Sequence, residues 1–273
     1  RPIMTDTKSQ TPAPKRRAAA KKQAGTTNAA KKAVSKAGPA PRKMPKALAD
    51  ARAQMAKKRK PSVRNKQTIH AIFAGLHAAN PEPKGELDYV NPFTLLVAVV
   101  LSAQATDTGV NRATSPLFAV AETPEKMLAL GEETVRDYIK TIGLYRTKAK
   151  NVIGLCEMLI AEHGSAVPQS REELEKLPGV GRKTANVVLN MAFGHETIAV
   201  DTHLFRLANR LRLAPGKTPL EVELGLEKVV PKEFRRHAHH WLILHGRFIC
   251  KATKPECEKC VIAEFCDSAD KRI

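Results

Sequence analysis

Apolar residues recur at helical spacing through most of the chain after residue 67. The helix expected at residues 67–80 carries its apolar side chains on one face: Ile69, Ile72, Phe73 and Leu76. Asn91 and Pro92 have the residue types of an N-cap and a first helical turn. The apolar run from Pro92 to Ala105 then predicts a buried helix that is too short to cross a membrane.

The same periodicity continues to the C-terminal region and predicts an all-α fold with short loops. Thr123 and Pro124 open a short helix, and Ser170 with Glu173 has the spacing of a capping box. No convincing run of alternating polar and apolar residues indicates a strand. Further helices are expected at 132–143 and 147–164, each ended by its glycine, and at 170–177, 182–193, 202–212, 232–248 and after Thr218.

Charge is concentrated in the N-terminal quarter of the 273-residue chain. Residues 1–66 hold 20 Lys and Arg against 2 acidic residues, whereas the remainder holds 26 against 25. The first 66 residues also lack aromatic side chains, so they cannot bury enough apolar area to offset the entropy of ordering. We therefore predict a disordered basic tail over residues 1–66.

Three roles fit such a tail. A polybasic segment binds polyanions by counterion release, it also aids solubility, and an organelle transit peptide is a third interpretation. Transit peptides favour arginine and an amphipathic stripe, whereas lysine dominates here. Because no segment has the length of a membrane span or the core of a signal peptide, we expect an intracellular protein without membrane association.

The stretch LPGVGRKTA, residues 177–185, separates two predicted helices by a turn with two glycines, Gly179 and Gly181. Glycine tolerates positive φ and lets another backbone approach closely. Free amides at the start of the next helix, together with its dipole, favour an anion such as a DNA phosphate. An ordinary tight turn is the alternative for the two glycines alone.

Lys183 falls in the first turn of that second helix. A solvated or phosphate-binding lysine is one interpretation, and a nucleophile is the other. A lysine amine attacks carbon only when it is uncharged, and both desolvation and the positive end of a helix favour that form. The position permits covalent chemistry without proving it.

Asp201 precedes the helix expected from Thr202, which is the usual place of an N-cap. Its functional alternative is to stabilise a developing positive charge or to move a proton. A carboxylate beside Lys183 would favour the charged amine, so a catalytic Asp201 would act on the cationic transition state or take a proton as the reaction proceeds.

Four of the five cysteines lie within 17 residues: Cys250, Cys257, Cys260 and Cys266. This density indicates a metal site rather than disulfides, with zinc and an iron–sulfur cluster both open on the chemistry. Lys251 and Lys254, in the loop between the first two, could present charge to phosphates or could simply be solvated. Cys156, on an apolar helix face, is expected in the core.

These motifs together resemble the endonuclease III family of DNA repair enzymes from about residue 67 to 270. LPGVGRKTA is similar to the family's helix-hairpin-helix, and the gaps of six, two and five residues between the cysteines are similar to its iron–sulfur loop. LSAQATD, TIGLY, LAPGK and HHWLILHGRFIC extend the likeness. The resemblance implies a [4Fe–4S] cluster on the four cysteines.

The resemblance also implies two helical domains with a cleft between them. A six-helix barrel with the hairpin would occupy residues 85–195, and a discontinuous cluster-bearing domain would occupy 67–84 and 196–273. The implied partner is duplex DNA with an oxidised or ring-saturated pyrimidine or an abasic site, bound by a monomer associated with the nucleoid in the cytoplasm. The damaged base would flip into the cleft.

Residue roles follow from the motif matches. Lys183 would attack the sugar and cut the strand by β-elimination, assisted by Asp201. Gln104 and Leu144 match residues that wedge into the duplex, although an exposed leucine is common in any protein. The other implied DNA contacts are Gly179, Val180, Gly181, Arg182, Thr184, Asp107, His203, Lys251 and Lys254.

Three other functions remain as alternatives. An adenine-mismatch glycosylase of the same fold lacks the hairpin lysine, so Lys183 argues against it. A non-catalytic, cluster-bearing DNA-binding module leaves Lys183 and Asp201 without a role. A chromatin-type structural protein fits the tail but not the hairpin or the cysteines.

Overall fold

The computed structural model describes residues 62–273, and these contain helices and no strand. The all-α prediction is confirmed for this part of the chain. Almost all of the predicted basic tail lies outside the described residues. Arg64, which the prediction assigns to the tail, instead donates to the carbonyl of Phe265 at 2.7 Å and pairs with Asp267 at 2.5 Å. Arg64 and Lys66, the first residue of α2, are therefore part of the described fold.

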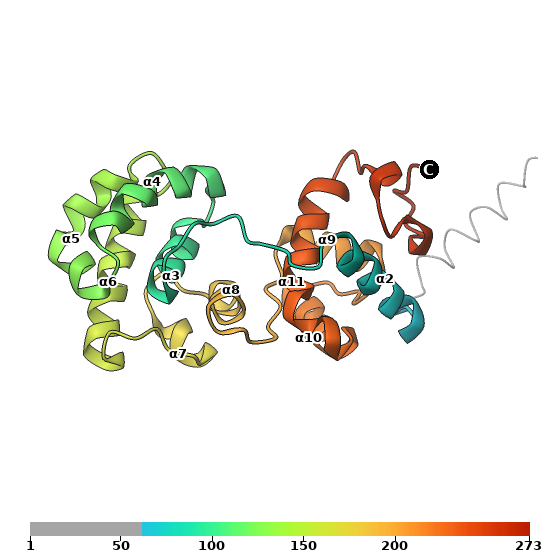
Figure 1. Cartoon of the computed structure of the whole chain (residues 1–273), viewed down its shortest axis with the longest axis horizontal. Helices are drawn as coiled ribbons and strands as arrows, with labels where there is room; N and C mark the ends of the chain where they lie inside the picture. The colour runs from blue at the N-terminus through green and yellow to red at the C-terminus, as the bar shows by residue number, and fades with distance from the viewer. Residues whose placement is uncertain (1–61) are drawn as a thin grey trace, which may run out of the picture. The chain divides into compact units, whose positions relative to one another are not determined.

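Ten α-helices of the described chain carry the fold (Figure 1). Their bounds are α2 Lys66–Ala79, α3 Pro92–Leu101, α4 Asp107–Val120, α5 Pro124–Ile139, α6 Tyr145–His163, α7 Arg171–Lys176, α8 Arg182–Phe193, α9 Thr202–Arg210, α10 Pro219–Val229 and α11 Arg235–Leu244. Three 3-10 helices, Lys232–Phe234, Cys257–Lys259 and Ala263–Phe265, and one π-helix, His245–Ile249, complete the elements.

Capping residues fix several helix starts where the sequence predicts them. Asn91 and Thr94 form a reciprocal capping box at α3, with both hydrogen bonds at 2.9 Å. Ser170 caps α7, but the Glu173 carboxylate pairs with Lys176 instead of returning to the cap. The predicted capping box is therefore only half formed.

Two helix predictions need correction. The helices expected on either side of residue 131 form the two parts of α5, which Gly131 interrupts with φ +75° as the sequence predicts, but the second part ends at Ile139 rather than Gly143. The single helix expected at 232–248 is instead a 3-10 turn, α11 and the π-helix in succession. The π-helix closes with a bond from the Cys250 amide to the His245 carbonyl at 2.7 Å.

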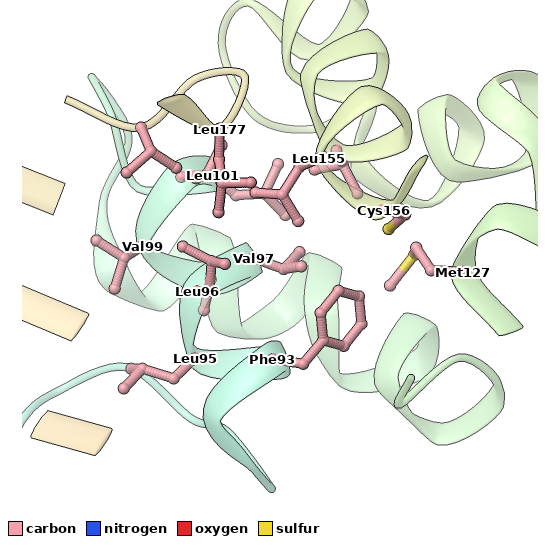
Figure 2. Packing of buried hydrophobic residues seen from close by; sticks show 14 of the residues in the cluster. Phe93, Leu95, Leu96, Val97, Val99, Leu101, Met127, Leu155, Cys156 and Leu177 are labelled. Carbon is pink, nitrogen blue, oxygen red and sulfur yellow. The ribbon is translucent and has the colours of Figure 1, made fainter. Parts of the chain in front are cut away.

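Buried side chains form two hydrophobic clusters, and the site described below contacts both. The first cluster gathers side chains of α3 to α8, including Cys156, which is fully buried (Figure 2). Burial raises the pKa of the Cys156 thiol to about 12, as expected for an inert core residue. The second cluster gathers α2, α9, α10 and α11.

The chain passes between the two clusters through residues 80–86 and again through 194–197. Trp241 fixes the end of α2 by donating from Nε1 to the carbonyl of Asn80 at 2.7 Å. All described residues belong to one compact unit. The division into a barrel domain and a cluster-bearing domain stays a prediction.

Candidate active site and cysteine loop

The glycine turn places the first turn of α8 at the surface without a side-chain cap. Gly179 takes φ +77°, whereas Gly181 is the extended N-cap of α8 with open space around its Cα. Because the first amides of a helix have no acceptor within it, this uncapped turn offers donors to an anion. Val180 does not contribute, since its side chain is buried and its amide donates to Leu177.

Of the two glycines in the turn, Gly179 should tolerate a side chain less well than Gly181. An added Cβ would lie 2.9 Å from Asn151 Nδ2 and 3.2 Å from Val100 Cγ1. We expect Gly179→Ala to lower the free energy of unfolding by about 1–2 kcal/mol, because a side chain is strained at positive φ. Urea unfolding measures this. Gly181→Ala is the control and should change stability by less than about 1 kcal/mol; equal losses would contradict the assignment of strain to Gly179.

Lys183 is exposed in the second position of α8, and it lines a pocket with residues of both clusters. Its amine has no hydrogen bond or ion pair with any residue in 62–273. The amine is open to a ligand.

The pocket has a volume of about 100 Å³. Its lining includes Ser102, Asp107, Lys183, Val187, Met191, His239, His240, Ile243 and Arg247. Asp107 thus lies beside the pocket. It is not a free carboxylate, because it pairs with Arg247 at 2.5 Å, and Arg247 also pairs with Glu86.

His239 and Arg247 are pocket residues that sequence analysis misses. Burial, with the neighbouring charges of His240 and Lys183, lowers the pKa of His239 to about 3, so its imidazole is neutral at physiological pH. Both residues lie within the helix expected at 232–248, and nothing in the local sequence separates them from its other polar positions.

Asp201 is the N-cap of α9. Its Oδ1 accepts from the amides of His203 at 2.9 Å and Leu204 at 2.8 Å. Neither Asp201 nor His203 lines the pocket, and no contact between Asp201 and Lys183 closer than 4.0 Å occurs in the described chain. His203 Nδ1 lies 3.4 Å from the Gly246 carbonyl and 3.3 Å from Arg206.

Gln104 and Leu144 lie in neighbouring loops with the same unusual backbone. Both have positive φ, +53° and +59°, and both are exposed. A Cβ built on Gly143 would lie 3.7 Å from the Gln104 carbonyl, so the two loops touch. Positive φ is costly for a side-chain-bearing residue and often marks a functional loop.

Arg182 and Thr184 flank Lys183 on α8. Thr184 is half-buried. Arg182 turns its guanidinium to Glu223 of α10, with Nε and Nη2 at 2.9 Å and 2.7 Å from the same carboxylate oxygen. A guanidinium held in this way has only part of its donor set left for DNA.

The four cysteines Cys250, Cys257, Cys260 and Cys266 line one apolar cavity, together with Leu207, Leu211 and Ile249. No three His, Cys, Asp or Glu side chains of residues 62–273 converge as ligands of a single ion. The four thiols surround a cavity instead of meeting at one position, and this arrangement suits an iron–sulfur cluster better than one zinc ion.

Helix α9 holds the start of the cysteine loop through backbone carbonyls. Arg206 Nη2 donates to Gly246 at 2.6 Å and its Nε to Cys250 at 3.2 Å. Arg210 donates to the carbonyls of Lys251 at 2.6 Å and Ala252 at 2.8 Å. The loop is therefore tied to the second cluster as well as to its own cysteines.

The two loop lysines differ in their partners. Lys251 pairs with Glu256, which Lys259 also contacts, and hydrogen bonds from these lysines lower the pKa of Glu256 to about 2. Lys254 is exposed and forms no ion pair within residues 62–273. Lys254 is the freer of the two for phosphate.

We expect Lys254→Gln to flatten the salt dependence of binding to undamaged duplex by about 0.9 in log–log slope, the value for one lost phosphate contact. Lys251→Gln should change the slope less, because Glu256 already neutralises that charge. Fluorescence anisotropy over a salt series measures both slopes. Equal slopes in the wild type and in Lys254→Gln would remove this lysine from the DNA interface.

Comparisons with known proteins agree with this site. Residues 97–232 match the model of the HhH-GPD superfamily of base excision DNA repair proteins, and residues 250–266 match the iron-sulfur binding domain of endonuclease III. Endonuclease III of Rickettsia conorii is 59% identical over 201 residues, which are 74% of this chain and 96% of the relative. That of Escherichia coli K12 is 56% identical over 207 residues, 76% and 98% of the two chains.

Solved structures of endonuclease III also resemble this chain. A trapped covalent endonuclease III–DNA intermediate aligns with a TM-score of 0.70 at 46% identity, covering 75% of this chain and 97% of that one. A non-covalent endonuclease III–DNA complex aligns with the same TM-score. A thermostable thymine-DNA glycosylase, 24% identical with a TM-score of 0.67, shares the fold. The chain therefore belongs to the endonuclease III family, as a bifunctional DNA glycosylase and AP lyase of base excision repair with a [4Fe–4S] cluster.

Proposed function

We propose that this enzyme removes oxidised or ring-saturated pyrimidines from duplex DNA, with Lys183 as the nucleophile. The observation that carries the proposal is the free, exposed amine in the uncapped first turn of α8, at a pocket that both clusters line. A nucleophile needs an accessible nitrogen, and the adjacent amides can hold the strand by its phosphate.

The reaction proceeds in two stages. The Lys183 amine, uncharged when it reacts, attacks C1′ of the extruded nucleotide; the C1′–N bond breaks and the base leaves with a proton. The C1′–O4′ bond of the sugar then opens, with a proton added to O4′, which leaves C1′ and the lysine nitrogen joined as an iminium. Loss of a proton from C2′ expels the 3′-phosphate as the C3′–O bond breaks, which cuts the strand on the 3′ side, and water hydrolyses the imine to release Lys183. No oxidant or reductant is consumed.

Asp201 is the proposed partner of Lys183 in proton transfer. Its Oδ1 is occupied by two amides of α9, so Oδ2 is the oxygen that could act on the reaction. The N-cap bonds and the chemistry are compatible because they use different oxygens. They also fix the carboxylate, which favours a defined proton path.

Gln104 and Leu144 are the proposed wedge residues. Their positive φ, exposure and adjacent loops support a shared role in filling the gap left by the extruded nucleotide. Gly179, Gly181 and Thr184 are proposed to hold the backbone nearby. The cluster, when bound by the four cysteines, holds the loop that carries Lys254.

DNA is the proposed partner of a monomeric enzyme associated with the nucleoid. No helix described here is long and apolar enough to cross a membrane. Residues 85–195 and the pair 67–84 with 196–273 are the proposed domains, each containing one hydrophobic cluster.

Borohydride trapping tests the proposal. Reduction of the iminium in a mixture of enzyme and duplex with a ring-saturated thymine should give a covalent protein–DNA adduct, with peptide mapping to Lys183. An undamaged duplex is the control and should give none. Absence of an adduct from the holoenzyme, or mapping to another lysine, would refute the assignment.

A further inference from the structure

Glu223 is a buried carboxylate in the middle of α10. Its side chain is 5% exposed, and neighbouring positions Val222 and Leu226 lie in the second hydrophobic cluster. A charged group in such a place is costly unless it is paired. Glu223 is paired with Arg182, and a second guanidinium, that of Arg171, lies 3.9 Å away.

The Arg182–Glu223 pair joins the first turn of α8 to the other hydrophobic cluster. Later residues of α8, among them Ala185 and Val188, are buried in the first cluster, whereas α10 is part of the second. The α8 N-terminus itself lacks a side-chain cap, and Gly181 has open space around it. The Arg182–Glu223 pair therefore ties the first turn of α8 to α10.

We propose that Arg182 is a positioning residue, which holds the α8 first turn against Glu223 and so sets the place of Lys183, rather than a residue that binds DNA. The inference rests on the proposed role of Lys183. Two of the guanidinium's donors converge on one oxygen of Glu223, whereas a phosphate contact would compete with that pairing. Lys183 is the next residue, so a shift of Arg182 moves it directly.

The two roles make opposite predictions for two substitutions. If Arg182 positions Lys183, Arg182→Met and Glu223→Gln should each slow single-turnover adduct formation by about tenfold to a hundredfold, the scale of a misplacement near 1 Å. DNA affinity and its salt slope should stay unchanged. The double variant should be no slower than the singles, because both remove the same contact.

A DNA contact would behave differently. Arg182→Met would then weaken binding and lower the salt slope by about 0.9, whereas Glu223→Gln would leave adduct formation at the wild-type rate. That pattern would overturn the proposal. Lower thermal stability of both variants with unchanged single-turnover rates would overturn it too, since it would show a purely structural pair.

The experiment uses the holoenzyme with saturating abasic duplex, borohydride quenching and a separate anisotropy titration. Glu173→Gln, which breaks the exposed 2.8 Å pair with Lys176 on α7, is the matched control and should react at the wild-type rate.

Glu223→Asp keeps the charge with a shorter reach and replaces Glu223→Gln if that variant does not fold. It should slow the rate less than Arg182→Met. A wild type that forms no adduct refutes the role of Lys183, whereas equal rates in wild type and variants refute only this inference.

Discussion

Lys183→Gln should abolish the covalent adduct and reduce strand cleavage at an abasic site by at least about a thousandfold, because loss of a covalent nucleophile leaves only binding and positioning. Glutamine keeps a similar length and a good helix propensity, so α8 should still form. The amide nitrogen cannot form an iminium. Single-turnover cleavage of an abasic duplex, followed by gel electrophoresis, measures the loss.

Binding should survive the same substitution. The Lys183 amine forms no hydrogen bond or ion pair with another described residue, so its removal breaks no polar interaction that supports the fold. Lys176→Gln, at an exposed site on α7, is the control and should cleave normally. Cleavage by Lys183→Gln at near wild-type rate would show that another amine is the nucleophile.

Cys260→Ser should remove the iron–sulfur cluster and destabilise the second hydrophobic cluster. Cys260 lines the shared cavity, and its Sγ lies 3.4 Å from Nε2 of the buried His245. A structural metal site contributes on the order of 10 kcal/mol to folding, which is comparable with the net stability of a domain, about 5–15 kcal/mol. We expect a loss of about 3 kcal/mol or more from a defective site.

Iron content, visible absorption and thermal unfolding of the purified variant measure this effect. Cys156→Ala removes the fifth cysteine, which lies in the first cluster and does not line the cavity. It should keep full iron content and lose only the packing of a small side chain. A Cys260→Ser protein with wild-type iron content and unfolding temperature would contradict a ligand role for this cysteine.

Local patterns predict much of this fold from the sequence. The apolar face of α2 and the Asn91–Pro92 start of α3 depend on neighbouring residues, and both are confirmed. Helix α4 is missed; Pro116 lies inside it and cannot donate a helical hydrogen bond. The widened turn after Leu244 is missed because tertiary packing, rather than residue type alone, selects it.

Among the candidate site residues, too, some features follow from local sequence and others depend on residues far away in the chain. The place of Lys183 in its helix and the N-cap role of Asp201 follow from local sequence, and both are observed. The partners of Arg182 and Asp107 lie 41 and 140 residues away, so local sequence does not reveal that these charges are already paired. Local sequence also does not reveal the pocket residue His239, because the burial that lowers its pKa arises from tertiary packing.

The π-helix at His245–Ile249 fixes the angular phase at which the chain enters the cysteine loop. Successive residues of an α-helix are about 100° apart, so deleting one residue here would swing Cys250 to another side of the helix axis while the other three sulfurs stayed in place. Gly246 adds a second limit, because a Cβ there would lie 3.1 Å from the His203 carbonyl. The number of residues in this segment and the absence of a side chain at position 246 are therefore both constrained.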